Sequence, residues 1–260
     1  MIQIDRSDAV AVVRLDRGDG RNALSARFMR EIAAAAESFR DDLDTRAIVL
    51  TGTSEVFSVG ADLKDPELAS RRDRGLLERR HALRVGPDMC AAWERVEQFT
   101  ICAIEGHCIG GGVALAVACD TRIAGSGASL RLPEIPLGMN MSWQSNPRLV
   151  NLMGVARAKR FIVLGEAMDA ETALAQGLVE DTVPAGQALD AALDLARRVA
   201  ALPPVGVRMT KQSVDAAAKA LNYTASYMDR DQFALTLGGE DQQEAVRAFL
   251  EKRAPTFTGR

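Results

Sequence analysis

The sequence predicts an α/β fold, because short apolar runs alternate with segments of helical periodicity. Residues 46–51, 101–104 and 121–124 are such runs, and each indicates a buried strand. The chain has 260 residues, 47% of them hydrophobic and 26% charged, a composition typical of a globular protein with a large core. We therefore expect a core of strands and helices over residues 1–201 and a helical region over residues 202–260.

The chain opens with a predicted hairpin and an amphipathic helix. Ile2 and Ile4 alternate with polar residues, residues 7–8 turn the chain, and residues 10–15 form the second strand. Ser25 is placed to cap the helix that follows. The apolar residues of this helix recur at spacings of four, three and four, namely Phe28, Ile32, Ala35 and Phe39.

The middle of the chain predicts a loop, a long helical stretch and two further strands. Residues 53–65 form the loop, and helical pattern then continues to about residue 99. Within it the run Arg71-Arg72-Asp73-Arg74 favours a solvated helix face over a patch for a phosphorylated ligand. After the strand at 101–104, the glycine triplet 110–112 opens an apolar helix that extends to Cys119.

Nearly all of the sequence from residue 151 onward has helical pattern. Asp169 is placed to cap one helix, and Gly177 to close it. The pair Pro203-Pro204 interrupts the next helix, which is why the C-terminal region is drawn from residue 202.

Charge and hydropathy exclude several classes of partner. Lys and Arg number 32 against 35 Asp and Glu, so the net charge of −3 provides no basic field for nucleic acid. The longest strongly apolar stretch, residues 113–119, is too short to cross a bilayer, and we expect no membrane partner. The N-terminus lacks the pattern of a signal peptide, so a cytoplasmic location is expected.

Cysteine and histidine give no sign of a metal site. The four cysteines form no Cys-x-x-Cys pair, and most lie in apolar stretches, which predicts buried reduced thiols. The two histidines, His81 and His107, have no metal-ligand spacing. We therefore expect no metal.

Two glycine-bearing loops follow buried strands and are the candidate site. Residues 57–64 follow the strand that ends at Gly52, and residues 106–112 follow the strand that ends at Ile104. Peptide N–H groups from two such loops can converge on one oxygen and stabilise negative charge there. A tight turn with close helix packing explains the same glycines equally well.

Six segments, in order, resemble the enoyl-CoA hydratase/isomerase (crotonase) superfamily over essentially the whole chain. They are Arg21-Asn22-Ala23-Leu24, Phe57-Ser58-Val59-Gly60-Ala61-Asp62-Leu63-Lys64, Glu105-Gly106-His107-Cys108-Ile109-Gly110-Gly111-Gly112, Pro133-Glu134, Ala175-Gln176-Gly177-Leu178-Val179 and Phe249-Leu250-Glu251-Lys252-Arg253. The resemblance implies a spiral of ββα units with a helical C-terminal oligomerisation region. It also implies homotrimers or dimers of trimers.

The resemblance further implies an acyl-CoA thioester substrate, with coenzyme A entering as part of that substrate and no other cofactor. The thioester oxygen would lie between the N–H groups of Ala61 and Gly111, and Glu134 would be catalytic. Arg21 and Ala23 match the turn beside the CoA nucleotide. Other positions matching the substrate or CoA site are Leu24, Gly60, Asp62, Leu63, Lys64, Gly110, Pro133, Phe233 and Lys252.

One departure from the family pattern bears on the reaction. Hydratases of the family use two glutamates, and the first of these positions is Ala114 here, while Glu134 keeps the second. One base suffices to move a double bond between C2 and C4, so a single-glutamate isomerase is favoured. The alternatives are a hydratase with an amide-held water, other enolate chemistry, another acid such as Glu105 or Asp120, and a non-catalytic acyl-CoA-binding scaffold.

A second departure lies after Glu134, where the family commonly has a glycine-rich segment. Met139, Met141 and Trp143 are bulky and apolar there, which predicts core filling or, alternatively, a reshaped acyl pocket. The amides in this segment provide groups that can hold a water or a polar acyl group; they are Asn140, Gln144 and Asn146.

Overall fold

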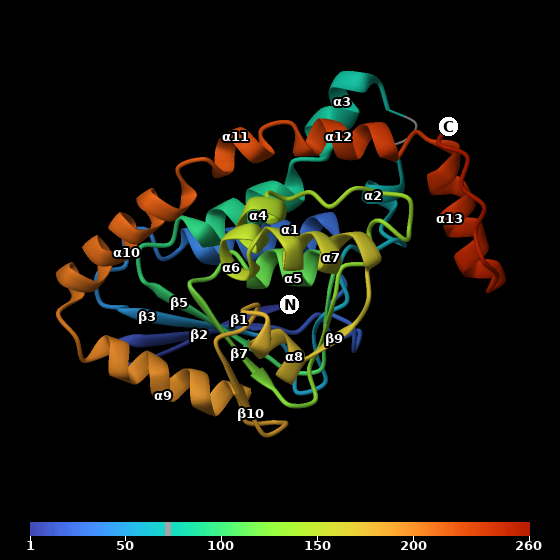
Figure 1. Cartoon of the computed structure of the whole chain (residues 1–260). Coiled ribbons are helices and arrows are strands. Elements are labelled where there is room, and N and C mark those ends of the chain that lie inside the picture. The colour runs from blue at the N-terminus through green and yellow to red at the C-terminus, as the bar shows by residue number, and fades with distance from the viewer. Residues whose placement is uncertain (71–73) are drawn as a thin grey trace.

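The computed structural model describes residues 1–70 and 74–260, and its strands form two sheets (Figure 1). The larger sheet has the order β1-β2-β3-β5-β7-β10, and the smaller has the order β4-β6-β8-β9. The larger contains β1 (Ile2–Ser7), β2 (Val10–Leu15), β3 (Ala47–Thr51), β5 (Phe99–Ile104), β7 (Thr121–Gly125) and β10 (Asp181–Val183). The smaller contains β4 (Val56–Ser58), β6 (His107–Ile109), β8 (Ser129–Arg131) and β9 (Met168–Asp169).

All neighbouring strands pair in parallel except β1 with β2 and β8 with β9.

Helices complete the expected α/β class. Those up to the Pro203-Pro204 break are α1 (Ala26–Glu37), α2 (Pro66–Ala69), α3 (Leu76–Ala82), α4 (Val85–Glu94), α5 (Gly111–Ala116), α6 (Ser145–Met153), α7 (Val155–Leu164), α8 (Ala170–Ala175) and α9 (Ala188–Ala200). Beyond it lie α10 (Pro204–Lys219), α11 (Asn222–Ser226), α12 (Asp229–Thr236) and α13 (Glu240–Glu251).

Helices cover both faces of the larger sheet (Figure 1). Helix α9 packs its alanines against one face, in a cluster with residues of β3, β5 and β7. Helices α1, α4 and α5 lie on the other face and contribute to the main core, where Trp93 and Phe28 are fully buried. Apolar side chains thus enter two layers, one on each side of a sheet whose central strands β3 and β5 are buried except at Phe99, where β5 begins.

Several predicted element boundaries are confirmed. The Ser25 hydroxyl accepts the Phe28 N–H at 3.1 Å and caps α1. The Asp169 carboxylate caps α8 through the Thr172 N–H at 2.8 Å, and Gly177 follows that helix with a φ of +78°. The four cysteines are buried free thiols, and burial raises the pKa of Cys90 to about 12.

Other boundaries differ from those predicted. The segment 53–65 contains strand β4, and the second glycine-bearing loop contains strand β6. Three-residue strands are too short to show an alternating pattern, which is why the sequence did not indicate them. The long helical stretch ends at Glu94, and α5 ends at Ala116 rather than at Cys119. Of the arginine-rich run, Arg71, Arg72 and Asp73 lie outside the described residues.

The C-terminal helices return across the helical layer (Figure 1). Helix α12 reaches α3, where Asp231 and Arg80 form an ion pair at 2.7 Å. Many large apolar side chains in this region are exposed, including Val205, Met209, Val214, Leu221, Tyr223, Leu235, Phe249 and Leu250. Within the described part of the chain, no helix combines the length and apolarity needed to cross a membrane.

Candidate active site

Parallel pairing of β4 with β6 brings the two glycine-bearing loops together. Val56 pairs with His107 and Ser58 with Cys108. Beyond these strands Gly60 has a φ of +85°, and a Cβ on it would lie 2.8 Å from the Ile109 oxygen and 3.3 Å from the Gly111 nitrogen. The backbones of the two loops therefore touch at a point where only glycine fits.

The N–H groups of Ala61 and Gly111 are both free at this contact. On one edge of the Ala61 segment, Leu24 N–H donates to the Gly60 oxygen at 2.8 Å, and Asp62 N–H donates to the Leu24 oxygen at 3.1 Å. That pairing leaves the Ala61 N–H on the opposite edge, and Ala61 is exposed. Gly111 is the first residue of α5, so its N–H has no helical acceptor. Neither N–H donates a hydrogen bond within residues 1–70 and 74–260.

Glu134 lies in the loop after β8, with its carboxyl against Gly110. Atom Oε2 is enclosed and has no hydrogen-bond partner among the described residues, although the residue as a whole is half-buried. Burial raises the pKa of Glu134 to about 7, and a hydrogen bond from its own backbone N–H opposes this rise. A carboxyl in this condition both accepts and donates a proton near neutral pH.

The other acids that the sequence offered are engaged in structural contacts. Glu105 Oε1 accepts the Ala188 N–H at 2.9 Å, where α9 begins. Asp120 forms an ion pair with Lys211 at 2.7 Å and accepts the Thr100 N–H at 2.8 Å. Asp62 forms an ion pair with Arg17 at 2.6 Å, and hydrogen bonds including that one lower its pKa against the effect of burial. None of these three resembles Glu134 in having an enclosed, unpaired carboxyl oxygen.

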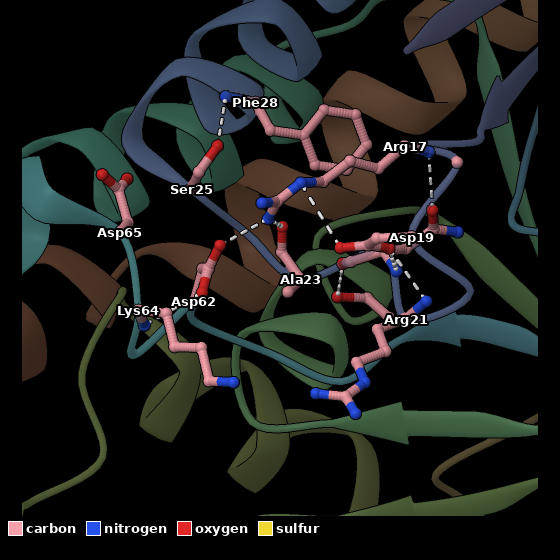
Figure 2. Close-up of polar contacts among 12 residues, drawn as sticks. Arg17, Asp19, Arg21, Ala23, Ser25, Phe28, Asp62, Lys64 and Asp65 are labelled. Atoms are coloured by element: carbon pink, nitrogen blue, oxygen red, sulfur yellow. Dashed lines mark hydrogen bonds and ion pairs between the residues drawn. The ribbon is translucent and has the colours of Figure 1, made fainter.

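A polar pocket of about 410 Å³ opens beside the first loop (Figure 2). It is lined by Arg17, Asp19, Arg21, Ala23, Ser25, Asp62, Lys64, Asp65 and Pro66. Arg17 Nη1 donates to the Ala23 oxygen and to Asp62 Oδ2, both at 2.6 Å, and so ties the two segments together. The side chains of Arg21 and Lys64 form no ion pair within the described residues, which leaves two cations available to an anionic ligand.

Sequence reasoning missed Arg17 and Asp19 in this pocket. They precede the segment Arg21-Asn22-Ala23-Leu24 and stand in a stretch rich in glycine and aspartate, which signals a turn rather than a binding role. Asn22, in contrast, is buried, and its Nδ2 donates to the Leu15 oxygen at 2.8 Å, so it holds the turn in place.

The remaining predicted residues divide into those near the glycine loops and those away from them. A Cβ on Gly110 would lie 3.9 Å from Pro133 Cδ, and one on Gly111 would lie 3.0 Å from Leu24 Cδ1. Leu63 is 72% exposed at the surface. Phe233 lies half-buried in α12 and Lys252 is exposed at the end of α13; neither lines the polar pocket of its own chain.

The segment after Glu134 contributes to the core, and its three amides differ in their hydrogen bonding. Met141 is 3% exposed and fills the core. Asn140 Oδ1 accepts the Thr236 hydroxyl at 3.2 Å, and Gln144 Oε1 accepts an Arg148 N–H at 3.3 Å, so these two amides are engaged. Asn146 Oδ1 is enclosed without a hydrogen-bond partner in the described part of the chain.

A second cavity, of about 680 Å³, lies between α6, α9 and α10. Its lining includes the Lys211–Asp120 ion pair but none of the residues predicted for the thioester or CoA site. Among the described residues, no group of three or more His, Cys, Asp or Glu side chains is placed to hold a metal ion.

Comparison with known proteins is consistent with this arrangement. The model of the enoyl-CoA hydratase/isomerase family matches residues 5–260. The chain is 34% identical over 262 residues to the probable enoyl-CoA hydratase echA8 of Mycobacterium tuberculosis, covering 100% of this chain and 98% of that one. It is 30% identical to the 2,3-dehydroadipyl-CoA hydratase of Escherichia coli, covering 99% and 98%.

Solved structures agree with these sequence relatives. An enoyl-CoA hydratase from Bacillus anthracis superposes with a TM-score of 0.78 at 31% identity, covering 100% of this chain and 99% of that one. An enoyl-CoA hydratase/isomerase from Pseudoalteromonas atlantica superposes with a TM-score of 0.86 at 26% identity, covering 99% of both. The chain belongs to the enoyl-CoA hydratase/isomerase (crotonase) family, whose members act on acyl-CoA thioesters.

Proposed function

We propose that this protein moves protons on an enoyl-CoA thioester with Glu134 as its single acid–base group. The observation that carries this proposal is the enclosed, unpaired Oε2 of Glu134, whose carboxyl has a pKa of about 7. Ala114, where hydratases of the family carry a glutamate, is fully buried and offers no acid or base. One carboxyl then does all of the proton transfer, which favours double-bond isomerisation.

In the proposed reaction, the Glu134 carboxylate removes a proton from C2 of a 3-enoyl thioester. The electron pair of that C–H bond forms a C1–C2 double bond as the carbonyl π pair moves onto the thioester oxygen, and the carboxyl keeps the proton. The oxygen pair then restores the carbonyl, the C1–C2 π pair forms the C2–C3 double bond, and the C3–C4 π pair takes up that proton at C4 from the same carboxyl. Negative charge on the thioester oxygen in between is stabilised by the free N–H groups of Ala61 and Gly111. Each such donor contributes about 2.7–4 kcal/mol. The chemistry is balanced without any cofactor.

The polar pocket supports a place for the CoA part of the substrate. Arg21 and Lys64 are unpaired cations that suit phosphate, and the Arg17 bridge holds Ala23 and Asp62 beside them. Phe233 and Lys252 lie outside this pocket in their own chain, so we place them at the CoA of a neighbouring subunit.

The C-terminal helical region supports assembly into trimers or dimers of trimers. Its exposed apolar side chains belong to α10, α11, α12 and α13, and Leu235, Phe249 and Leu250 are each at least 69% exposed. Large apolar side chains exposed on these helices are the kind of surface that protein–protein interfaces bury.

Hydration of a 2-enoyl-CoA is the second candidate, and two observations favour it. The relatives described above carry hydratase names. Asn146 Oδ1 is an enclosed acceptor without a partner among the described residues, which suits a bound water. In this alternative Asn146 holds the nucleophile that a second glutamate holds elsewhere in the family.

The deciding experiment measures exchange of the C2 hydrogen of a saturated acyl-CoA in deuterated water. Glu134→Gln keeps the shape but removes the base, and we expect exchange to fall by about 10²–10⁴-fold with acyl-CoA affinity retained. Glu105→Gln is the matched control, because the amide oxygen still accepts the Ala188 N–H, and exchange should persist. Full exchange in Glu134→Gln would remove this glutamate from the mechanism.

Turnover then separates the two candidate reactions. An isomerase converts a 3-enoyl-CoA to the conjugated 2-enoyl-CoA, and absorbance of the conjugated thioester rises. A hydratase consumes the 2-enoyl-CoA, and that absorbance falls. Loss of hydration in Asn146→Ala with C2 exchange preserved would favour the second candidate.

A further inference from the structure

The indole of Trp143 is seated between two glycines of different helices. A Cβ on Gly86 of α4 would lie 2.5 Å from Cζ2 and Nε1 of this ring, and a Cβ on Gly111 of α5 would lie 2.6 Å from its Cη2. The ring therefore packs directly on the Cα atoms of both glycines. Since Gly111 also provides one of the free N–H groups, the indole lies beside the place where a thioester oxygen would be held.

The backbone that carries this ring is held in an uncommon conformation. Trp143 and Gln144 are both left-handed, with φ values of 60° and 59°, which bulky residues rarely adopt. Two hydrogen bonds hold their backbone: Gln144 N–H donates to Asp229 Oδ2 at 2.6 Å, and Arg148 Nη1 donates to the Trp143 oxygen at 2.9 Å. Arg148 is itself held by an ion pair with Glu94 at 2.8 Å. The position of the indole is thus fixed from three elements.

Trp143 differs from Trp93, the other tryptophan of the chain, which is a core residue. Trp93 is fully buried, and its indole N–H donates to the Ile32 oxygen at 3.1 Å, as expected of a core residue. Trp143 is only half-buried, and its indole N–H has no acceptor among the described residues and is not enclosed. The partly exposed edge of the ring is thus the one that carries the indole nitrogen, beside Gly86, while Cζ3 and Cη2 on the opposite edge pack against Gly111.

We propose that Trp143 is the wall of the acyl pocket and limits the protein to short acyl groups. The inference rests on the proposed function, because it takes Gly111 N–H as a donor to the thioester oxygen. A ring in contact with the Cα of that same residue occupies the space into which a longer chain would extend. Gly86 makes room for the ring, which explains a glycine inside α4 where alanine would be the better helix former.

Binding of saturated acyl-CoAs, which cannot isomerise or add water, tests the proposal by calorimetry. The natural chain should bind butanoyl-CoA more tightly than octanoyl-CoA. In Trp143→Ala the ratio of the octanoyl-CoA affinity to the butanoyl-CoA affinity should rise at least tenfold, since each buried methylene is worth about fourfold in affinity. Trp93→Phe, a change in the other tryptophan, should leave the ratio unaltered. An unaltered ratio in Trp143→Ala would overturn the proposal.

A pair of glycine variants tests the seat of the ring. Gly86→Ala places a Cβ within the indole, so it should displace the ring and lower butanoyl-CoA affinity about tenfold or more. The double variant Gly86→Ala/Trp143→Ala removes the clash and should bind octanoyl-CoA as Trp143→Ala does. Equal losses in the single and double variants would show that Gly86 acts apart from Trp143 and would overturn this part.

Fluorescence reports on the ring even where affinity changes little. In Trp93→Phe the only indole is Trp143, and butanoyl-CoA should change its emission. In Trp143→Phe the remaining indole is buried in the core and should not respond. Failure of the proposed function looks different: neither acyl-CoA would bind the natural chain, or Glu134→Gln would exchange C2 hydrogens fully. If binding and exchange behave as proposed but the chain-length ratio does not shift, only this inference fails.

Discussion

The carboxyl of Glu134 lies so close to Gly110 that a Cβ on this glycine would stand 2.7 Å from Oε1. Gly110 has a φ of +54° and a ψ of −116°, a conformation that glycine alone adopts readily. Its N–H donates to the Arg131 oxygen at 2.8 Å, at the end of the strand that leads to Glu134. Gly110 therefore contacts the Glu134 carboxyl and directly precedes Gly111, whose free N–H lies in the first turn of α5.

The first prediction concerns this glycine. Gly110→Ala should lower C2 exchange by about 10²-fold. The new methyl group would overlap the Glu134 carboxyl and push it away from C2 of the substrate, and it would also strain the backbone of residue 110. Exchange of a saturated acyl-CoA in deuterated water measures it. Gly127→Ala is the control, since its Cβ would meet nothing closer than 3.6 Å. Unchanged exchange in Gly110→Ala would contradict the placement of the base.

The second prediction is the pH dependence of exchange. Only the ionised carboxylate removes a proton, and Glu134 has a pKa of about 7. Exchange at low acyl-CoA concentration should therefore rise about tenfold per pH unit below 7 and level off above it. A midpoint between pH 4 and 5, the range of an ordinary glutamate, would show that the carboxyl is not enclosed in solution.

The third prediction links the same carboxyl to stability. Because the folded-state pKa is raised from 4.5, the folded protein keeps a proton that the unfolded chain has lost. Stability should then be greatest below pH 4.5 with respect to this group and fall as the pH rises through 7. Glu134→Gln, which stays neutral, should be more stable than the natural chain at pH 8 by about 1–3 kcal/mol.

Urea unfolding at pH 8 and at pH 5 checks the third prediction. The gain in free energy of unfolding should be large at pH 8 and small at pH 5, where the natural carboxyl remains protonated. Glu105→Gln should show no such gain, because that carboxylate accepts a hydrogen bond in the folded protein. A gain that is equal at both pH values would point to packing and not to ionisation.

The fourth prediction concerns the polar pocket. Arg21→Gln and Lys64→Gln should each weaken acyl-CoA binding by about 3–10-fold at low salt, and by less at high salt, because the lost contact is electrostatic. Calorimetry at two ionic strengths measures this. Arg27→Gln provides a control at an arginine that is exposed and paired with Glu31. Equal losses in all three variants would indicate a general effect of charge.

The fifth prediction concerns assembly. The natural chain of 28.0 kDa should sediment at three or six times that mass. Leu250→Glu places a charge on the exposed apolar surface of α13 and should shift the distribution toward smaller species. Leu43→Glu changes a side chain that is 78% exposed in the N-terminal part of the chain and should leave the mass alone. A monomer of the natural chain would refute the proposed trimer.

Local signals in the sequence predicted a good part of this fold. Ser25 and Asp169 are helix caps with short-range hydrogen-bond partners, so their roles can be read from neighbours along the chain. Glu134 and the loops around Ala61 and Gly111 were predicted as site residues through ordered motifs, and the pairing of β4 with β6 brings these loops together.

The rest depends on contacts between residues far apart in sequence. Strands β4 and β6 are three residues long and exist because they pair with each other. Gly86 has no local signal at all, because its significance is the distant Trp143 ring that packs on it. Arg17 likewise gains a role only when Asp62 folds against it. A pattern within one segment cannot report such pairs.

The hydrogen bond from Gln144 to Asp229 spans 85 residues and has a consequence for synthesis. At roughly 5–20 residues per second, the ribosome delivers Asp229 about 4–17 s after Gln144. Until then nothing from α12 holds the left-handed pair Trp143 and Gln144, although both glycine-bearing loops have already emerged. A nascent chain thus carries both glycine-bearing loops before it carries Asp229, and the hydrogen bond that holds Gln144 can form only after Asp229 has been delivered.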